Sequence, residues 1–172
     1  MKSAVGRRVC RFLPAAAASF LCACSPGLNW REVHVGELTA MLPCKPDSAT
    51  RQIALDKKSY EMNVTGCEVA GDLFVISLLQ AEDHAQAPLA MAHLRAASLA
   101  AVKARNVHPM PDSGDAQSSF DVQVAGLRPD GTPVQVRFKW LMLGTEIYQL
   151  GVYAATLSEE QTGPLMHESR LK

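Results

Sequence analysis

Hydrophobic and polar residues alternate with a period of two along much of the chain, which is the pattern of β-strands. The segments that predict strands are 30–35, 38–42, 49–55, 58–69, 73–79, 120–124, 134–142 and 146–155. Segment 73–79, with the sequence LFVISLL, is apolar at positions of both parities, which predicts a central strand that is buried on both faces. Pro43 and Pro46 end the second strand, because proline cannot donate to a strand ladder.

Turn residues between these segments predict how the strands pair. Segments 49–55 and 58–69 flank Asp56-Lys57 and are expected to form a hairpin. The residues from Arg128 to Gly131 read RPDG, where Pro presets one backbone angle and Gly accepts a positive φ. With a further turn at Gly144-Thr145, the last three predicted strands form an antiparallel meander.

The two faces of segment 134–142 differ in character. One face carries the apolar side chains of Val134, Val136, Phe138, Trp140 and Met142. The other face carries Gln135, Arg137 and Lys139. We interpret Arg137 and Lys139 as part of a solvated face, with a contact to a partner as the alternative.

One segment has helical periodicity instead. Pro88 suits a first helical turn, and 88–105 predicts a long helix. Its apolar face is formed by Ala90, Met91, Leu94, Ala97, Ser98, Ala101 and Val102. Lys103 and Arg105 near its carboxyl end complement the helix dipole. The polar segment 106–119 is expected to be a linker.

The end of the chain predicts a second, short helix. Two capping boxes are possible, Thr156 with Glu159 and Ser158 with Gln161. Gly163-Pro164 is expected to interrupt the helix before 165–171. Local hairpins together with one long helix and one C-terminal helix predict an α+β fold, in which the two helices flank an antiparallel sheet.

The first 25 residues resemble a secretory leader in composition. Its basic residues are Lys2, Arg7, Arg8 and Arg11. They precede an apolar run over 12–21, which is shorter than the roughly 20 residues that cross a bilayer. A basic start followed by a short apolar core is typical of a cleaved signal peptide.

The end of the leader, Leu21-Cys22-Ala23-Cys24, resembles the lipobox of bacterial lipoproteins. The resemblance implies that the Cys24 thiol takes a diacylglycerol group, that cleavage follows Ala23, and that the new amino terminus is acylated. Two or more acyl chains anchor a protein stably to a membrane. Ser25 stands where an Asp would retain a lipoprotein in the inner membrane, so the resemblance favours the outer membrane, with the protein facing the periplasm.

These features divide the chain into a signal peptide over 1–23, a tether over 24–29 and a single α+β domain over 30–172. An ordinary signal peptide with coincidental cysteines is the alternative for the leader. A twin-arginine route is a second alternative, suggested by Arg7-Arg8.

The net charge becomes negative when the leader is set aside. The chain has 17 basic and 17 acidic residues; the leader holds four of the basic residues and none of the acidic ones. The remaining 149 residues therefore carry 13 basic and 17 acidic residues, a net charge of −4. Nucleic-acid binding requires a basic face, so nucleic acid is not an expected partner.

The five cysteines are Cys10, Cys22, Cys24, Cys44 and Cys67. Once the leader and the lipidated Cys24 are excluded, Cys44 and Cys67 remain as a pair in an oxidising compartment, and we predict a disulfide. Counting from the hairpin turn sets position 48 approximately opposite Cys67, with Cys44 just upstream. Two free thiols are the alternative, and a metal site is less favoured still.

Several features together resemble a known kind of protein. Trp30 opens the first strand, and Leu42-Pro43-Cys44-Lys45-Pro46 follows the second, as in short proteobacterial envelope lipoproteins. The ending Glu168-Ser169-Arg170-Leu171 resembles the last helix of PsbP-like domains. The likeness spans most of 30–171. It implies an α/β/α sandwich used as an accessory or assembly module, and it brings no catalytic residues.

Groups that could carry chemistry are scattered. The histidines are His34, His84, His93, His108 and His167, and none stands in a zinc-binding motif. Asp83-His84 is interpreted as a solvated loop pair. Trp30, Phe138 and Trp140 are interpreted as core, with a ligand pocket as the alternative. No catalytic residue, cofactor or metal site is predicted.

The leading hypothesis is therefore a lipid-anchored, non-catalytic binding or assembly module of a bacterial envelope. Its expected partners are the membrane, through the lipid anchor, and an envelope protein. An envelope hydrolase whose site is assembled by the fold is the second hypothesis. A structural envelope tether is the third.

Overall fold

The computed structural model describes residues 27–111 and 119–172. The predicted leader over 1–23 and the predicted lipidation site Cys24 lie outside the described residues. Of the predicted tether over 24–29, only the last three residues are described. The last of them, Asn29, already belongs to the fold, because its backbone N–H donates to the carbonyl of Pro43 over 2.8 Å.

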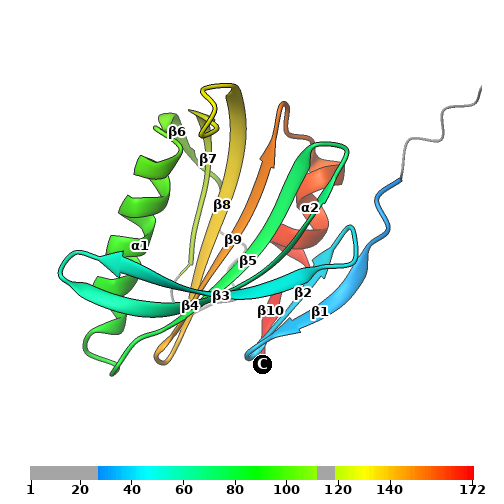
Figure 1. Cartoon of the computed structure of the whole chain (residues 1–172). Coiled ribbons are helices and arrows are strands. Elements are labelled where there is room, and N and C mark those ends of the chain that lie inside the picture. The colour runs from blue at the N-terminus through cyan, green and yellow to red at the C-terminus, as the bar shows by residue number, and fades with distance from the viewer. Residues whose placement is uncertain (1–26, 112–118) are drawn as a thin grey trace, which may run out of the picture.

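Within these described residues, ten strands form two antiparallel sheets (Figure 1). The small sheet has the order β1-β2-β10, with β1 Arg31–Val35, β2 Leu38–Leu42 and β10 Arg170–Leu171. The large sheet has the order β3-β4-β5-β9-β8-β7-β6. Its strands are β3 Asp47–Leu55, β4 Lys58–Val69, β5 Asp72–Gln80, β6 Arg105–Pro109, β7 Ser119–Leu127, β8 Pro133–Leu143 and β9 Glu146–Ala154. The fold is therefore α+β, as the pattern predicted.

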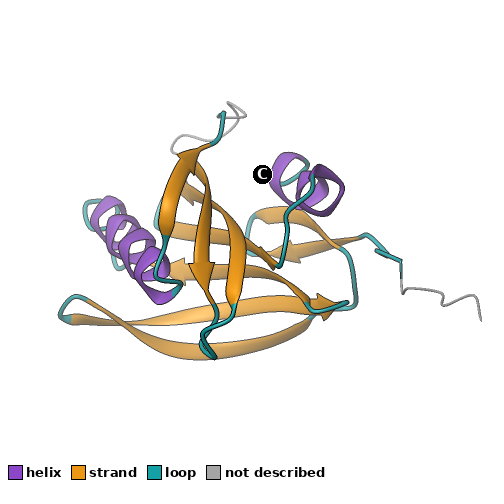
Figure 2. Ribbon diagram, turned by 90° about the horizontal axis from the view of Figure 1, so that it is seen from above, coloured by secondary structure: helices purple, strands orange, loops and turns teal. Residues whose placement is uncertain are grey.

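Two helices lie on opposite sides of the large sheet (Figure 2). Helix α1, Ala87–Ala101, covers one face and shares a core with residues that include Phe138 and Trp140. Helix α2, Glu159–His167, and the small sheet cover the other face. The second core contains Leu38, Leu42, Phe74, Ile76, Tyr148, Leu150, Val152, Leu165 and Met166. Strand alternation explains this division, because successive side chains of one strand enter different cores.

The hairpin β3–β4, the central position of β5 and the β7–β8–β9 meander agree with the predictions. The predicted helix over 88–105 is wrong at its carboxyl end, because α1 stops at Ala101. Lys103 has a φ of 49°, and its N–H donates to the carbonyl of Ala100, while the N–H of Ala104 donates to the carbonyl of Leu99. These two hydrogen bonds form a Schellman motif, which usually has glycine at the position of Lys103.

The predicted linker over 106–119 is also wrong in part. Strand β6, Arg105–Pro109, follows α1 after a few residues and pairs with β7 at the edge of the large sheet. Its side chains are exposed, so the segment has no hydrophobic alternation by which a strand could be recognised.

The C-terminal segment departs from the prediction after His167. Of the two possible capping boxes, the one that forms is Ser158 with Gln161. Pro164 lies inside α2 without interrupting it. It forgoes one hydrogen bond, to the carbonyl of Glu160 in the exposed first turn. The predicted helical ending over 165–171 is correct as far as His167 and wrong beyond it, because Arg170 and Leu171 form strand β10 against β2.

The end of α1 yields a test. A non-glycine residue in the left-handed region costs about 1 kcal/mol, so Lys103→Gly should raise the free energy of unfolding by about that amount. The matched control is Ala100→Gly, inside the helix, which should lower it by about 1 kcal/mol. Chemical denaturation measures both. Equal destabilisation by the two glycines would contradict the assigned helix end.

Candidate docking surface

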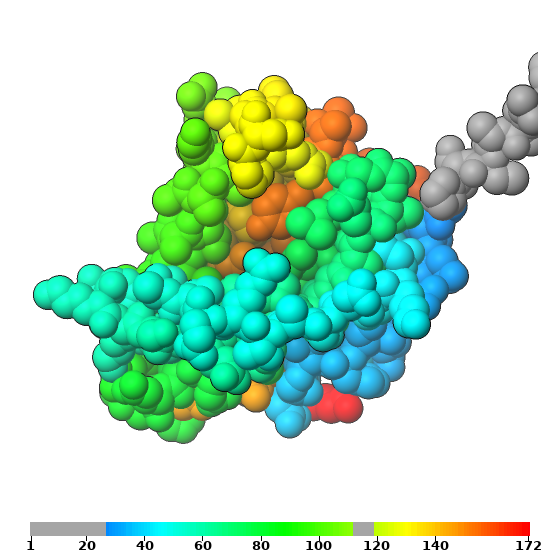
Figure 3. All heavy atoms as spheres, viewed as in Figure 1, coloured from blue at the N-terminus to red at the C-terminus, as the bar shows by residue number. Residues whose placement is uncertain are grey.

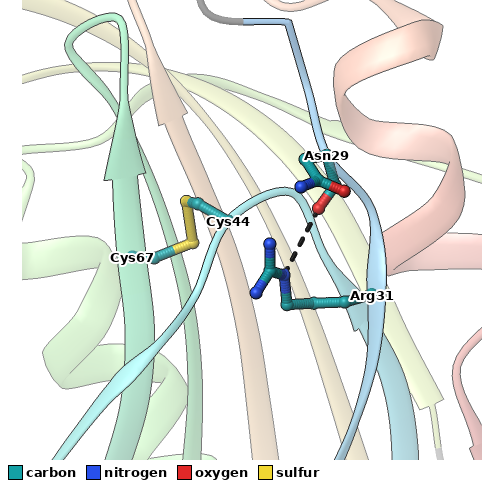
Figure 4. The surroundings of a disulfide bond; sticks show 4 residues. All are labelled: Asn29, Arg31, Cys44 and Cys67. Atoms are coloured by element: carbon teal, nitrogen blue, oxygen red, sulfur yellow. Dashed lines mark hydrogen bonds between the residues drawn. A yellow bond between two sulfur atoms is a disulfide. The ribbon is translucent and has the colours of Figure 1, made fainter.

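Cys44 and Cys67 form a disulfide, with an S–S distance of 2.03 Å and a Cα–Cα distance of 5.9 Å (Figure 4). The predicted register was two residues off, because Ser48 lies opposite Thr65. Counted onward, the position opposite Cys67 is 46, beyond the end of the ladder, and Cys44 reaches across there. The disulfide therefore closes the open end of the β3–β4 hairpin. Beside it, the side chain of Arg31 donates to the carbonyl of Asn29 over 3.5 Å.

The five histidines lie on separate elements. His34 is on β1, His84 precedes α1, His93 is on α1, His108 is on β6 and His167 is on α2. Among residues 27–111 and 119–172, no group of three or more His, Cys, Asp or Glu side chains is placed to hold a metal ion.

The Asp83-His84 pair has a local structural role. Asp83 Oδ1 accepts a hydrogen bond of 2.8 Å from the backbone N–H of Gln86, just before α1. This bond lowers the pKa of the Asp83 carboxyl, because it favours the charged form. His84 is exposed, which agrees with a solvated loop.

His34 contacts both a hydroxyl and a carboxylate. Its Nδ1 lies 3.1 Å from Thr39 Oγ1, and its Nε2 lies 3.5 Å from Glu32 Oε1. A hydroxyl, an imidazole and a carboxylate in series are the groups of a nucleophilic site. However, Thr39 is only 4% exposed, and an attacking hydroxyl must reach its substrate. The contact with Thr39 instead ties β1 to β2, whose register places His34 opposite Thr39.

The three aromatic residues considered as a pocket lie on different faces of the sheet. Trp30 packs edge-on against Phe74, with 6.0 Å between ring centroids, at the core beneath the small sheet. Phe138 and Trp140 stack with 5.0 Å between centroids and are fully buried in the core beneath α1. These three side chains therefore do not line one pocket, and the interpretation as core holds for Phe138 and Trp140.

The solvated face predicted for Arg137 and Lys139 is wrong. Arg137 is 2% exposed and Lys139 is 4% exposed, because α2 covers this side of β8. Arg137 donates to both carboxylate oxygens of Asp121, over 3.1 and 3.0 Å, and to Thr162 Oγ1 over 3.2 Å. Lys139 Nζ donates to the carbonyl of Met166 over 2.7 Å.

Through these contacts, Arg137 and Lys139 on β8 hold α2 against the sheet. Removing one partner of a buried ion pair costs roughly 3–5 kcal/mol, since it leaves the other charge uncompensated. At the rim, His167 Nε2 lies 3.0 Å from Glu159 Oε1. Two residues of α2, Thr162 and Met166, are held by cations from the sheet, so α2 is a fixed cover here.

Strand β3 differs from every other long strand of the large sheet. It is an edge strand, and its residues from Asp47 to Gln52 are exposed whichever face they point to. The middle of β3 therefore contacts β4 and has no cover on either face. In Figure 3, this part of the chain belongs to the cyan ridge across the front. Its register with β4 runs from Asp47 to Leu55 without a shift.

The backbone of β3 presents unpaired groups at alternate residues. Leu55 and Lys58 close the hairpin around a two-residue turn, which makes them a hydrogen-bonded pair. Counting back by two, Ala49 and Arg51 bond to β4, whereas Ser48, Thr50, Gln52 and Ala54 direct their backbone groups outward. Cross-strand side-chain bonds from Ser48 and Thr50 agree, because side chains lie closest at non-hydrogen-bonded pairs.

The opposite edge of the sheet is blocked. In β6, the register shifts between Arg105 and His108, Asn106 has a φ of 51°, and Pro109 lacks an N–H. Bulges and proline are the devices by which proteins protect an edge from further pairing. Strand β3 has neither within its span.

The tip of the β3–β4 hairpin is held by the start of α1. Lys58 Nζ lies 3.0 Å from Glu82 Oε2 and also bonds Gln86 Oε1. A hollow of about 150 Å³ lies between hairpin and helix. It is lined by Leu55, Asp56, Lys57, Lys58, Tyr60, Gln86, Leu89 and His93. Together with the disulfide at the other end, these contacts fix β3 at both of its ends.

The sequence pattern predicted a strand here but did not predict that β3 would be exposed on both faces. The available signal was the run DSATRQ over 47–52, which lacks the apolar alternation of a half-buried strand. A strand with polar residues on both faces belongs at an edge, where neither face is covered.

Comparison of this chain with protein-family models, with curated proteins and with solved structures finds no match. Over the described parts of the chain, no helix has both the length and the apolar character needed to span a membrane. The function is therefore inferred from the contacts of the chain itself.

The free edge predicts a pattern in amide hydrogen exchange. In dilute protein, the amides of Ser48, Thr50 and Gln52 should exchange rapidly, whereas those of Ala49 and Arg51 should be protected by β4. Nuclear magnetic resonance resolves the individual amides. Uniform protection along β3 in dilute protein would mean that the edge is covered within a single copy.

Proposed function

We propose that the chain is a lipid-anchored protein of a bacterial envelope that acts as a non-catalytic docking module. The observation that carries this proposal is the regular, uncovered edge of β3 in a sheet whose other edge is blocked. An added strand would complete the backbone hydrogen bonds that β3 leaves outward, which is how sheets recognise extended segments.

The geometry around β3 favours binding over accidental exposure. An open edge is a hazard of aggregation, and proteins usually cover or blunt it. Here the strand is anchored at Cys44 by the disulfide, while its hairpin partner begins at Lys58, which contacts the α1 region. A strand already fixed in its extended form loses little conformational entropy on pairing, which favours affinity.

The resemblance of the leader to a lipobox supports placement of the domain on a membrane through Cys24. Asn29, whose backbone N–H donates to the carbonyl of Pro43, follows Cys24 by five residues, so the folded domain would stand close to the lipid surface. A net charge of −4 beyond the leader gives the domain no general attraction to anionic lipid, and the acyl chains would supply the binding. The outer membrane, facing the periplasm, is the proposed location.

We also propose that the fold is the PsbP-like α/β/α sandwich that the resemblance implies. Its support is the placement of α1 and α2 on opposite faces of an antiparallel sheet. The departure is the ending over 168–171, where a strand stands in place of the last helix.

The docking role is tested by removing one outward donor. Thr50→Pro deletes a backbone N–H that faces away from β4, and Thr50→Ala is the matched control that loses the same side chain but keeps the donor. Loss of a hydrogen bond and a disturbed edge should weaken association about tenfold or more in the proline variant. Chemical cross-linking of the full chain in intact envelopes measures the associated fraction.

Thermal unfolding of both variants is the control for folding. The docking role is excluded if wild type, Thr50→Ala and Thr50→Pro, all folded, give the same cross-linked species.

The anchor is tested separately at Cys24. Intact-mass analysis of protein extracted from membranes should show residues 1–23 removed and acyl chains on Cys24, because the lipobox chemistry needs the cysteine sulfur. Cys24→Ser should abolish the added mass and shift the protein out of the membrane fraction. An unmodified Cys24 in a protein free in the medium would overturn the proposed location.

A further inference from the structure

We propose that the strand which docks on β3 is β3 of a second copy, paired antiparallel about a two-fold axis at Ala49. This inference rests on the proposed docking function and names its partner. A two-fold interface uses the same surface on both copies, so the strand must be complementary to itself. The sequence DSATRQ of 47–52 can be tested for that property residue by residue.

The backbone satisfies the first condition. An axis at Ala49 places Ser48 of one copy opposite Thr50 of the other, and both residues direct their N–H and C=O groups outward from β4. They would therefore exchange backbone hydrogen bonds on each side of the axis. Pro46 has no N–H to contribute, which limits the pairing to the part of β3 that follows it.

The charges satisfy the second condition. Asp47 and Arg51 are exposed, lie on the same face of β3, and make no ion pair among the described residues. An axis at Ala49 places Asp47 of each copy opposite Arg51 of the other. These are non-hydrogen-bonded pairs, in which facing side chains lie closest, and opposite charges there stabilise a sheet.

Neighbouring registers are less favourable. An axis at Arg51 would bring the two copies of Arg51 face to face, and an axis at Ser48 would place Lys45 opposite Arg51. Facing like charges destabilise a strand pair. An axis at Thr50 would leave Asp47 opposite Ile53 and Arg51 opposite Ala49, so that no charge is paired. The register at Ala49 is the one in which both charges find partners.

The surroundings of the axis leave room for a second copy. Residues 47–52 are exposed on both faces of β3, so no other element of the described structure overhangs this part of the strand. The side chain on the axis is the methyl group of Ala49, which is small enough to meet its own copy at the close spacing of a non-hydrogen-bonded pair.

The test uses a cysteine on the axis of the full chain. In the proposed register, Ala49→Cys places two thiols at a Cα distance of roughly 4.5–5.5 Å, within the range that a disulfide spans. The matched control is Ala54→Cys, another exposed alanine of β3, whose facing position in the second copy, Cys44, is already held in the disulfide with Cys67. Its two copies would lie roughly 33 Å apart, at about 3.3 Å per residue, too far to cross-link.

Membranes from cells that express each full-length variant are analysed by non-reducing electrophoresis, with wild type as the control for the native cysteines. The expected result is a reducible dimer for Ala49→Cys, at least about tenfold more abundant than for Ala54→Cys or wild type. Equal amounts of dimer in the two cysteine variants would overturn the proposal.

A charge exchange tests the register independently. In the Ala49→Cys background, Arg51→Asp would face Asp47 of the second copy with a like charge and should reduce the dimer several-fold. Adding Asp47→Arg to Arg51→Asp restores opposite charges and should restore the dimer. A single reversal without effect, or a double exchange that fails to recover the dimer in folded protein, contradicts this register.

The two proposals can fail separately. If Ala49→Cys cross-links to a different protein, self-pairing is wrong, while β3 remains a docking edge. If Thr50→Pro leaves every association intact, the docking function itself is wrong.

Discussion

A sheet whose strands bury side chains on both faces must be covered on both faces, and this constraint organises the molecule. Strands β8 and β9 place Trp140 and Ile147 beneath α1, and Tyr148 and Leu150 beneath the small sheet and α2. Burial of such side chains contributes about 1.5–3 kcal/mol each, so the covers follow the apolar strands. They do not extend over the middle of β3, whose residues offer no apolar surface to bury.

The same constraint explains the charged side chains of β8. A cover placed over Arg137 and Lys139 removes them from water, which is unfavourable unless their donors find acceptors. Asp121 on the neighbouring strand and the carbonyl of Met166 on α2 provide those acceptors. The hydrogen bonds from Arg137 to Thr162 and from Lys139 to Met166 fix how α2 lies on the sheet. The face of β8 that the sequence analysis interpreted as solvated is therefore buried.

The proposed docking surface lies on β3, whose middle is covered neither by the helices nor by the small sheet. The β3–β4 hairpin is fastened by the Cys44–Cys67 disulfide at one end and by the contact of Lys58 with Glu82 at the other. Between these points, β3 is extended, regular and unpaired along one side. In the proposed pairing, this surface would bind through its backbone, and the charges of Asp47 and Arg51 would supply selectivity.

Much of this protein was determined by its sequence alone. Period-two alternation located most strands, and the RPDG turn located the last meander, because these signals are local. The disulfide was predicted by counting, since Cys44 and Cys67 are the two cysteines that remain beyond the predicted lipidation site Cys24. The early end of α1 was hidden, since Lys103 stands where a Schellman motif usually has glycine.

Only the tertiary structure decided which strand became an edge and which charges became buried. A strand shows the same alternation whichever neighbours it has, so the sequence of β8 did not reveal that α2 would cover Arg137. The polar strand β3 is left at the boundary because covering it would bury no apolar surface. Its position there, and with it the candidate docking surface, depends on how distant segments pack.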